Sequence, residues 1–251
     1  MRISIQKHGV KLLCNRLIPS KKPQNHTLRG KVVGFSTKSN RRFRDLLISA
    51  YVPGKNYIAI SLTIPEKITS GEWFSLLKRF RMQLLRKNKP AIWRVELQKR
   101  KVPHLHLIGF GNNILDVGDY WLSWVNSVDS LQNSDGVPFS VHKGFLIYGF
   151  VAKFVRSENW FKYLACHSSK HKTTQLGWEG RQWGVIGRDM ISFTSDSDFE
   201  LDDFLAVRLC RCIRRMTRYN VTKDNLGSYL VFCSPCLVRR IITFYSDLLP
   251  F

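Results

Sequence analysis

The sequence predicts an α+β protein: an antiparallel central sheet with helices packed on it, a basic N-terminal extension and a helical C-terminal tail. Short apolar or alternating runs are interleaved with segments of helical periodicity. Two of these runs are separated only by a short basic turn, so they should form an antiparallel hairpin. Hydrophobic residues make up 44% of the 251 residues, which is enough for a sizeable core.

The first 56 residues are expected to form a basic extension with only short ordered pieces. They carry 13 lysines and arginines against one acid, Asp45, so this segment holds +12 of the chain's net charge of +22. Proline and glycine interrupt it repeatedly, which disfavours long regular elements. Its densest basic cluster is expected to bind nucleic-acid phosphates and comprises Arg41, Arg42 and Arg44.

The middle of the chain carries the clearest element signals. Residues 57–64 (YIAISLTI) are apolar and partly alternating, which predicts a buried strand. Apolar residues then recur at helical spacing through residues 70–87, which predicts an amphipathic helix. Residues 91–98 and 102–110 predict the two strands of a hairpin, and the basic turn between them contains Lys99, Arg100 and Lys101.

Four more elements complete the expected sheet and its cover. We expect a helix over residues 115–131 and a strand over residues 144–153. A third helix is expected over residues 157–170, and a short strand over residues 181–188. Together these elements indicate a sheet with helices packed on it.

The C-terminal part is expected to be helical. The sequence Ser197-Asp198-Phe199-Glu200 fits a capping box, so a helix should begin there. Residues 229–249 are apolar and should be helical in their last part. The chain therefore divides into a basic extension (1–56), a central domain (57–190) and a helical C-terminal region (191–251).

Four of the six cysteines allow two interpretations. Cys210 and Cys212, with Cys233 and Cys236, could supply four thiolates to a zinc ion. However, the first two fall in the expected helix, where residues two apart point to different sides. The alternative is small, buried, reduced thiols, because the N-terminus shows no secretory signal and an intracellular location is expected.

The large excess of positive charge predicts a polyanionic partner. Nucleic acid is the leading class, and an anionic membrane surface is the second. No window approaches the roughly 18 uninterrupted apolar residues of a membrane span, so membrane insertion is not expected.

The pattern His104-Leu105-His106 is the most informative feature for chemistry. Residues two apart on a strand project from the same face, so the two imidazoles should stand side by side. The hairpin should bring Glu96 close to them. Two imidazoles and a carboxylate suit Mn²⁺ or Mg²⁺ with positions open for substrate oxygens. The competing interpretation is two histidines on the solvent-facing side of an amphipathic strand.

The surrounding residues resemble those of the HUH endonucleases, the rolling-circle replication initiators of small phages and plasmids. Residues 93–107 (WRVELQKRKVPHLHL) are similar to the family's acid-ended strand, turn and Pro-His-x-His-hydrophobic motif. Residues 60–65 (ISLTIP) resemble its first motif, and residues 160–170 (WFKYLACHSSK) resemble the helix with the nucleophilic tyrosine. Arg181-Gln182-Trp183-Gly184 resembles a further element after that helix. The resemblance spans residues 57 to about 188 and implies an RRM-like nuclease core.

The resemblance also implies a reaction and its residues. The expected activity is metal-dependent nicking and rejoining of single-stranded origin DNA through a 5′-phosphotyrosyl link, with Glu96, His104 and His106 as metal ligands. Family members often carry Tyr-x-x-x-Tyr-x-x-Lys on the helix, and the second tyrosine is the usual nucleophile. Here Tyr163 and Lys170 match the first tyrosine and the lysine, while His167 replaces the second tyrosine. Tyr163 is therefore the expected nucleophile, and His167 and Lys170 share its helix face as further catalytic candidates. A cation such as Lys170 would favour the phenolate form of the tyrosine. His167 could alternatively be the nucleophile itself.

The expected partners follow from the same resemblance. Arg181 and Trp183 should contact DNA together with the basic clusters. Tryptophans and a phenylalanine could stack on unpaired bases, and these candidates are Trp93, Trp160, Phe161, Trp178 and Trp183. No Gly-x-x-x-x-Gly-Lys-Ser/Thr loop occurs, so strand unwinding is expected to come from a helicase of the host. A host polymerase is the other expected protein partner, and the bacterial cytoplasm is the expected location.

Two other functions stay open on the sequence alone. His167 permits a relative of the same fold that binds DNA and has lost cleavage. A basic RNA-binding module on the same sheet is the other possibility. Such a sheet needs aromatic residues at its strand centres, where this chain has His104 and His106.

Overall fold

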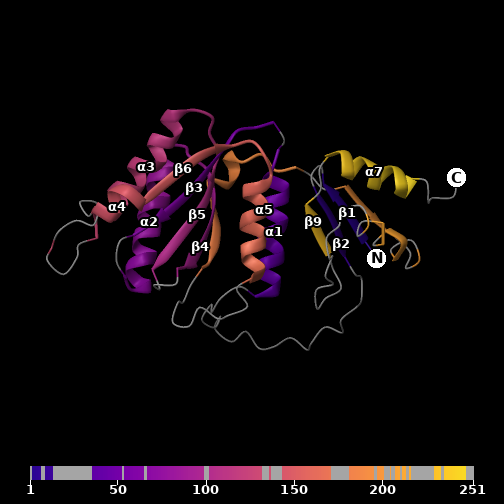
Figure 1. The fold of residues 1–251 in the computed structure, drawn as a ribbon, viewed down its shortest axis with the longest axis horizontal. Coiled ribbons are helices and arrows are strands. Elements are labelled where there is room, and N and C mark those ends of the chain that lie inside the picture. The colour runs from indigo at the N-terminus through magenta and orange to yellow at the C-terminus, as the bar shows by residue number, and fades with distance from the viewer. Residues whose placement is uncertain are drawn as a thin grey trace. The chain divides into compact units, whose positions relative to one another are not determined.

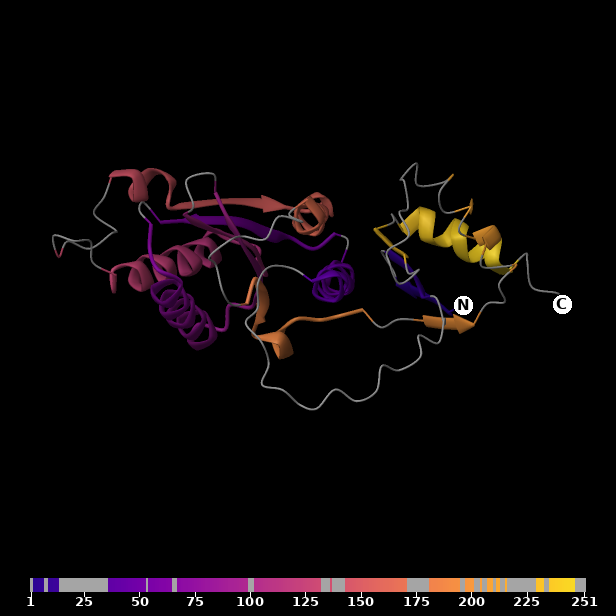
Figure 2. The same cartoon turned by 90° about the horizontal axis from the view of Figure 1, so that it is seen from below.

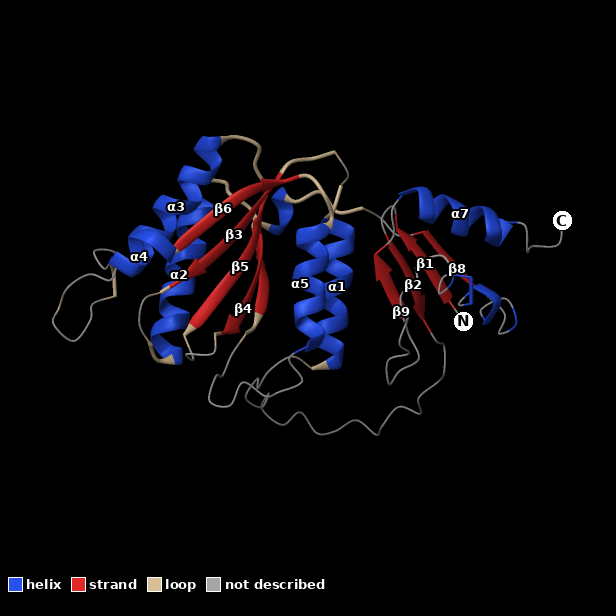
Figure 3. Cartoon of the chain, in the orientation of Figure 1, coloured by secondary structure: helices blue, strands red, loops and turns tan. Residues whose placement is uncertain are grey.

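The chain contains two compact units, each with its own sheet (Figures 1 and 3). The larger unit comprises Lys31–Asn40 and Pro53–Ser192, and the smaller one comprises Met1–Gly30, Arg41–Val52 and Phe193–Phe251. The computed structural model describes residues 2–6, 9–13, 36–52, 54–64, 67–98, 102–131, 136, 143–170, 181–194, 197–200, 204, 207–209, 211–212, 215, 229–232 and 235–246.

The larger unit is built on a five-stranded antiparallel sheet. Its strand order is β6-β3-β5-β4-β7, so β5 lies at the centre. This architecture confirms the predicted α+β class. The strands are β3 (Tyr57–Thr63), β4 (Ala91–Leu97), β5 (Pro103–Gly109), β6 (Phe150–Val155) and β7 (Trp183–Ile186).

Helices cover both faces of this sheet. Figure 2 shows α2 (Ser70–Arg86) and α3 (Ile114–Val128) together on one side and α5 (Asn159–Lys170) on the other. Both α2 and α3 begin with capping boxes, formed by Thr69 with Glu72 and by Asn113 with Asp116. These reciprocal hydrogen bonds satisfy main-chain N–H groups that the first helical turn leaves without helical partners.

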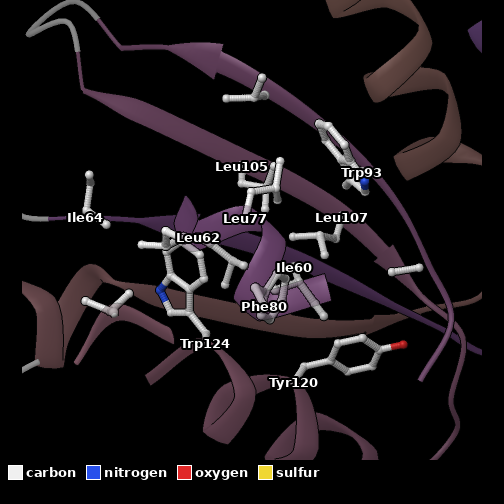
Figure 4. Close-up of a cluster of buried hydrophobic side chains, with 14 of the residues drawn as sticks. Ile60, Leu62, Ile64, Leu77, Phe80, Trp93, Leu105, Leu107, Tyr120 and Trp124 are labelled. Carbon is white, nitrogen blue, oxygen red and sulfur yellow. The ribbon is translucent and has the colours of Figure 1, made fainter. Parts of the chain in front are cut away.

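The main core lies between the sheet and the pair α2 and α3. Figure 4 shows strand residues such as Leu62 and Leu107 directed at aromatic side chains of the two helices. Trp124 of α3 packs edge-to-face against Phe80 and Trp73 of α2, with ring centroids 5.4 and 6.4 Å apart. Burial of these large rings adds to the hydrophobic stabilisation of the unit.

The strand expected over residues 144–153 begins later than predicted. Residues Lys143–Tyr148 form a short helix, α4, and β6 follows from Phe150. Between them, Gly149 donates its N–H to the carbonyl of Phe145 at 2.8 Å. A Cβ at this position would lie 2.5 Å from that carbonyl oxygen, so the close turn requires glycine. The apolar run alone did not reveal this turn.

The smaller unit joins the two ends of the chain in one sheet. Its order is β8-β1-β2-β9, with antiparallel neighbours throughout. The strands are β1 (Arg2–Gln6), β2 (Gly9–Leu13), β8 (Ser197–Glu200) and β9 (Tyr229–Phe232), and α7 (Pro235–Ser246) follows. The expected division at residues 56 and 190 therefore separates strands that pair with each other.

Two expectations about the ends of the chain are wrong. Residues 197–200 do not begin a helix, because they pair as β8 with β1, where Asp198 lies opposite Ser4. The N-terminal segment contains more than short ordered pieces, since α1 (Thr37–Ala50) is 14 residues long. Phe43 and Leu47 of α1, four residues apart, are fully buried, so burial of one helix face outweighs the local density of charge.

Two further features concern membranes and cysteines. No helix in the described ranges is long and apolar enough to cross a membrane. Cys210 and Cys233 lie outside the described residues, so the zinc interpretation stays a prediction. Cys212 is half-buried, and burial raises the pKa of its thiol.

Candidate active site

Two histidines project from one face of the central strand β5. Leu105 and Leu107, which alternate with them, are buried in the core on the opposite face. The imidazole rings of His104 and His106 lie with centroids 4.3 Å apart and planes at 83°. The period-2 pattern therefore predicted their side-by-side arrangement correctly.

Hydroxyl groups of β3 orient both rings. Ser61 lies opposite His106 in the strand register, and Thr63 lies opposite His104. Ser61 Oγ is 3.1 Å from His106 Nδ1, and Thr63 Oγ1 is 2.5 Å from His104 Nδ1. A hydrogen bond at Nδ1 fixes the orientation of an imidazole and leaves Nε2 for a ligand or another partner. Sequence reasoning missed these two roles because they depend on which strand pairs with β5.

Glu96 of β4 completes the group that the hairpin was expected to assemble. It lies opposite His104 in the register, and its Oε1 is 2.8 Å from Nε2 of His106. Both side chains are largely buried. The side-chain nitrogen of Gln98, just beyond β4, is 3.2 Å from Nδ1 of His104. The three predicted metal ligands are thus neighbours on one face of the sheet.

Helix α5 brings a tyrosine and a tryptophan to these histidines. The ring of Tyr163 lies 5.4 Å from the ring of His106, and the ring of Trp160 lies 5.7 Å from it. The two α5 rings stack on each other at 4.8 Å with planes only 9° apart. Burial raises the pKa of the Tyr163 phenol, and the charge of Glu96 raises it further, whereas the charge of Arg94 lowers it.

Arg94 of β4 is a buried cation on the same face. It lies opposite His106 in the register, and its side chain is 1% exposed. Its Nη1 donates a hydrogen bond to the carbonyl of Leu164 on α5 at 3.1 Å. Burial lowers the pKa of its guanidinium to about 10, against the opposing charges of Glu96 and Tyr163. Arg94 and Glu96 are two apart on one strand, and this spacing was the one sequence signal that could have identified Arg94.

The other predicted catalytic residues lie in the last turns of α5. His167 and Lys170 belong to the helix, but their side chains lie outside the described part of the structure. Their roles therefore stay predictions. The same holds for Lys99, Arg100 and Lys101, which fall between the described ends of β4 and β5.

The predicted DNA-binding residues are spread over both units. Trp183 of β7 lies opposite Arg94 and donates its indole N–H to Ser39 Oγ at 2.8 Å. Arg181 is exposed just before this strand. Three further arginines lie on α1, where Arg42 is exposed and the other two, Arg41 and Arg44, are half-buried.

Two of the five aromatic candidates for base contacts are packing residues instead. Trp93 is buried on the core face, and a Cβ on Gly184 would come within 2.8 Å of its ring. Phe161 is fully buried and contacts the ring of Tyr57 edge-to-face at 4.9 Å. Trp178 lies outside the described residues. Trp160, which is half-buried beside His106, keeps a position from which it could reach a substrate.

The donor set of two imidazoles and a carboxylate fits a divalent metal in chemistry. Adjacent ligand atoms of a six-coordinate ion lie about 3 Å apart when each bond is near 2.1 Å. Glu96 Oε1 and His106 Nε2 lie 2.8 Å apart, which is the length of the hydrogen bond between them and is close to that separation for this one pair. Among the described residues, however, no three histidine, cysteine or acidic side chains are already arranged as a metal site. Metal binding by Glu96, His104 and His106 therefore stays a proposal.

The chain is similar in sequence to proteins that are named as replication proteins. No protein-family model and no solved structure matches it. A protein of Xylella fastidiosa strain 9a5c named as a replication protein is 26% identical over 204 residues, which cover 74% of this chain and 66% of that protein. The replication-associated protein of Pseudomonas phage Pf3 is 26% identical over 201 residues, 72% of this chain and 67% of the phage protein. The chain thus spans about two thirds of the length of these relatives.

Proposed function

We propose that this chain initiates rolling-circle DNA replication by nicking and rejoining single-stranded origin DNA. Tyr163 is the nucleophile, and Glu96, His104 and His106 hold a divalent cation, Mn²⁺ or Mg²⁺. The similarity to proteins named for replication supports the process. The contact between Tyr163 and His106, with ring centroids 5.4 Å apart, is the observation that carries the proposed chemistry.

The reaction is a transesterification at phosphorus. Tyr163 Oη forms a bond to the scissile phosphate, and the bond from phosphorus to the 3′ oxygen breaks. The phenol proton passes to solvent, and the departing 3′ oxygen takes up a proton. One phosphodiester is exchanged for another, so the 5′-phosphotyrosyl link keeps the energy needed to rejoin the strand.

The surrounding residues divide the remaining tasks. Ser61 and Thr63 orient the histidine rings. A bound divalent cation would polarise the scissile phosphate and neutralise charge that builds on its oxygens. The basic residues outside the site would bind phosphates without regard to sequence, which makes the affinity strongly dependent on salt.

The test is a search for a covalent adduct. The full chain is incubated with Mn²⁺ and a pool of randomised single-stranded oligonucleotides labelled at the 3′ end, and the products are separated under denaturing conditions. We expect labelled DNA to migrate with the protein, because a 5′-phosphotyrosyl link retains the 3′ fragment. The same pool labelled at the 5′ end should yield no labelled adduct.

Two variants decide which residue reacts. Tyr163→Phe removes the phenolic oxygen and should abolish the adduct, whereas His167→Phe should leave it in place. An adduct that survives Tyr163→Phe would contradict the nucleophile assignment.

A DNA-binding relative without cleavage is the second candidate. The observation that favours it is His167, which stands where the resembling family usually has its nucleophilic tyrosine. Tight, salt-sensitive binding of single-stranded DNA without any adduct would support this candidate and would overturn the nicking proposal. The basic residues outside the site would then hold the DNA.

A further inference from the structure

Arg94 stands out because a guanidinium is costly to remove from water. Among the residues whose exposure the structure describes, it is the only lysine or arginine that is fully buried. Because its side chain is 1% exposed, a DNA phosphate cannot reach it without a rearrangement of the sheet or of α5. The proposed chemistry assigns no step to this residue.

The hydrogen bonds of Arg94 and Trp160 cross between the sheet and α5 on both sides of Tyr163. Arg94 Nη1, from β4, donates to the main-chain oxygen of Leu164, the residue that directly follows Tyr163. Trp160 Nε1, three residues before Tyr163, donates in the opposite direction to the main-chain oxygen of Leu107 on β5 at 2.8 Å. Each bond joins a side chain of one element to the backbone of the other, so the pair restricts sliding and rotation of the helix over the sheet.

Apolar packing alone would hold α5 less specifically. The described side chains of this helix that are fully buried are those of Phe161, Leu164 and Ala165. Apolar contacts have no preferred direction, whereas a planar guanidinium donates hydrogen bonds only within a narrow range of geometries. A small rotation of the helix would move the phenol of Tyr163 away from His106, and displacements of about 1 Å can cost a hundredfold in rate.

We propose that Arg94 is a positioning residue: together with Trp160 it pins α5 to the sheet and holds Tyr163 beside His106. Its effect on the rate rests on the proposed nicking function, whereas the pinning of α5 does not. Arg94 acts through its hydrogen bond to the main chain of α5 at Leu164.

The experiment compares four variants of the full chain. R94M keeps an unbranched side chain but removes every donor, and R94K restores one donor and the charge. W160F removes the second hydrogen bond and keeps an aromatic ring that can stack on Tyr163. R81M is the matched control, because Arg81 is an exposed arginine on α2, on the opposite face of the sheet.

The first readout is hydrogen exchange of backbone amides, which needs no activity. R94M should speed exchange in α5 by about tenfold or more, the loss expected for one hydrogen bond to a charged donor, and should leave α2 unchanged. W160F should act in the same direction with a smaller effect, R94K should recover much of the protection, and R81M should match the wild type. Unchanged exchange in α5, or an equal rise in α2 and α5, would overturn the proposal.

The second readout is the rate of adduct formation at saturating DNA, measured with the half-saturating DNA concentration. R94M should lower the rate about 10- to 100-fold while the half-saturating concentration stays nearly constant, and R94K should restore part of the rate. A rate equal to that of the wild type would overturn the positioning role even if nicking is confirmed. If R94M does not fold, R94K and W160F decide both readouts. If the wild type forms no adduct, the nicking function fails while exchange still tests the pinning of α5.

Discussion

The two faces of the five-stranded sheet use the same strands for different purposes. The face toward α2 and α3 carries apolar side chains, such as Ile60 and Leu105, that are fully buried. The face toward α5 carries polar side chains that bond to one another, including Ser61 with His106. Adjacent residues therefore differ in role because side chains alternate across a strand. This sheet therefore keeps its main apolar core on one face and a hydrogen-bonded polar network on the other.

The polar face is also buried, and this makes its hydrogen bonds important. His106 is 3% exposed, and Glu96 contacts it in the same low-dielectric setting. A buried polar group without a partner costs free energy, so the members of this network depend on each other. Substitutions on the polar face should therefore lower stability as well as cleavage, whereas conservative substitutions on the apolar face should lower stability alone.

The largest effect should come from His106→Ala on the polar face. The loss of a metal ligand should lower metal-dependent adduct formation by at least about a thousandfold, because the bound ion contributes several kcal/mol to transition-state stabilisation. Salt-sensitive binding of single-stranded DNA should change little, since it depends on distant cations. The yield of adduct measures cleavage, and a fluorescence titration with single-stranded DNA at two salt concentrations measures binding. A large loss of binding instead would indicate that the histidine reads DNA directly.

A smaller effect should follow from Ser61→Ala. This change removes the hydroxyl 3.1 Å from His106 Nδ1. Loss of such an outer partner should raise the Mn²⁺ concentration needed for half-maximal adduct formation about 10- to 100-fold. The free energy of unfolding should fall by about 1–3 kcal/mol, because Nδ1 of the buried His106 loses this partner. If Mn²⁺ dependence does not move, Ser61 has no part in orienting a ligand.

The neighbouring residue on the opposite face provides the matched comparison. Ile60→Val removes one methylene from the core and should lower the free energy of unfolding by about 0.5–1.5 kcal/mol. Urea denaturation measures this loss, and the Mn²⁺ dependence of adduct formation should stay at the wild-type value. A shifted Mn²⁺ dependence would show that the two faces are coupled.

The smallest effect should be on how the free energy of unfolding depends on pH, through a carboxylate of α3 on the apolar side of the sheet. The carboxylate of Asp116 on α3 lies 2.6 Å from Nζ of Lys89. Burial raises the pKa of this carboxyl, but hydrogen bonds from Lys89 and from the main-chain N–H groups of Asn112 and Asn113 lower it by more. The pKa of Asp116 in the folded protein is therefore lowered. A lowered folded pKa gives stability that is present above about pH 4 and is lost as the pH falls through the folded pKa. Asp116→Asn should cost up to about 1 kcal/mol at neutral pH.

Urea titrations over a range of pH test this assignment. The difference between the wild type and Asp116→Asn should shrink as the pH falls below about 4, because the wild-type carboxylate is then protonated. A difference that does not depend on pH would mean that the carboxylate charge has no role.

Much of the larger unit could be predicted because its signals are local. The helix over α2 follows from apolar spacing, and the hairpin of β4 and β5 follows from two strand patterns around a short turn. The alternation of side chains along β4 and β5 was enough to predict that His104, His106 and Glu96 lie on the same face of the sheet. The tyrosine helix was found through its resemblance to a family motif, and its contact with His106 could not be read from spacing.

The features that the sequence failed to predict depend on contacts between distant parts of the chain. The acidic stretch at residues 197–200 satisfies the local rule for a helix start, yet it pairs with β1 from the opposite end of the chain. Partner choice between distant strands depends on burial and register, which no short window contains. The same reason explains why Ser61, Thr63 and Arg94 were missed as parts of the site.

The amino-acid sequence by itself therefore determined which side chains share a strand face, because the backbone geometry of a strand makes alternation obligatory. It also determined that the chain is strongly basic and carries a His-x-His pair with an acid one strand away. Three features could be known only from the folded chain: the hydroxyls that orient the rings, the arginine that is buried and the position of α5. These features depend on which distant strands pair and on where a helix packs. Both are set by the sum of many weak contacts across the whole unit.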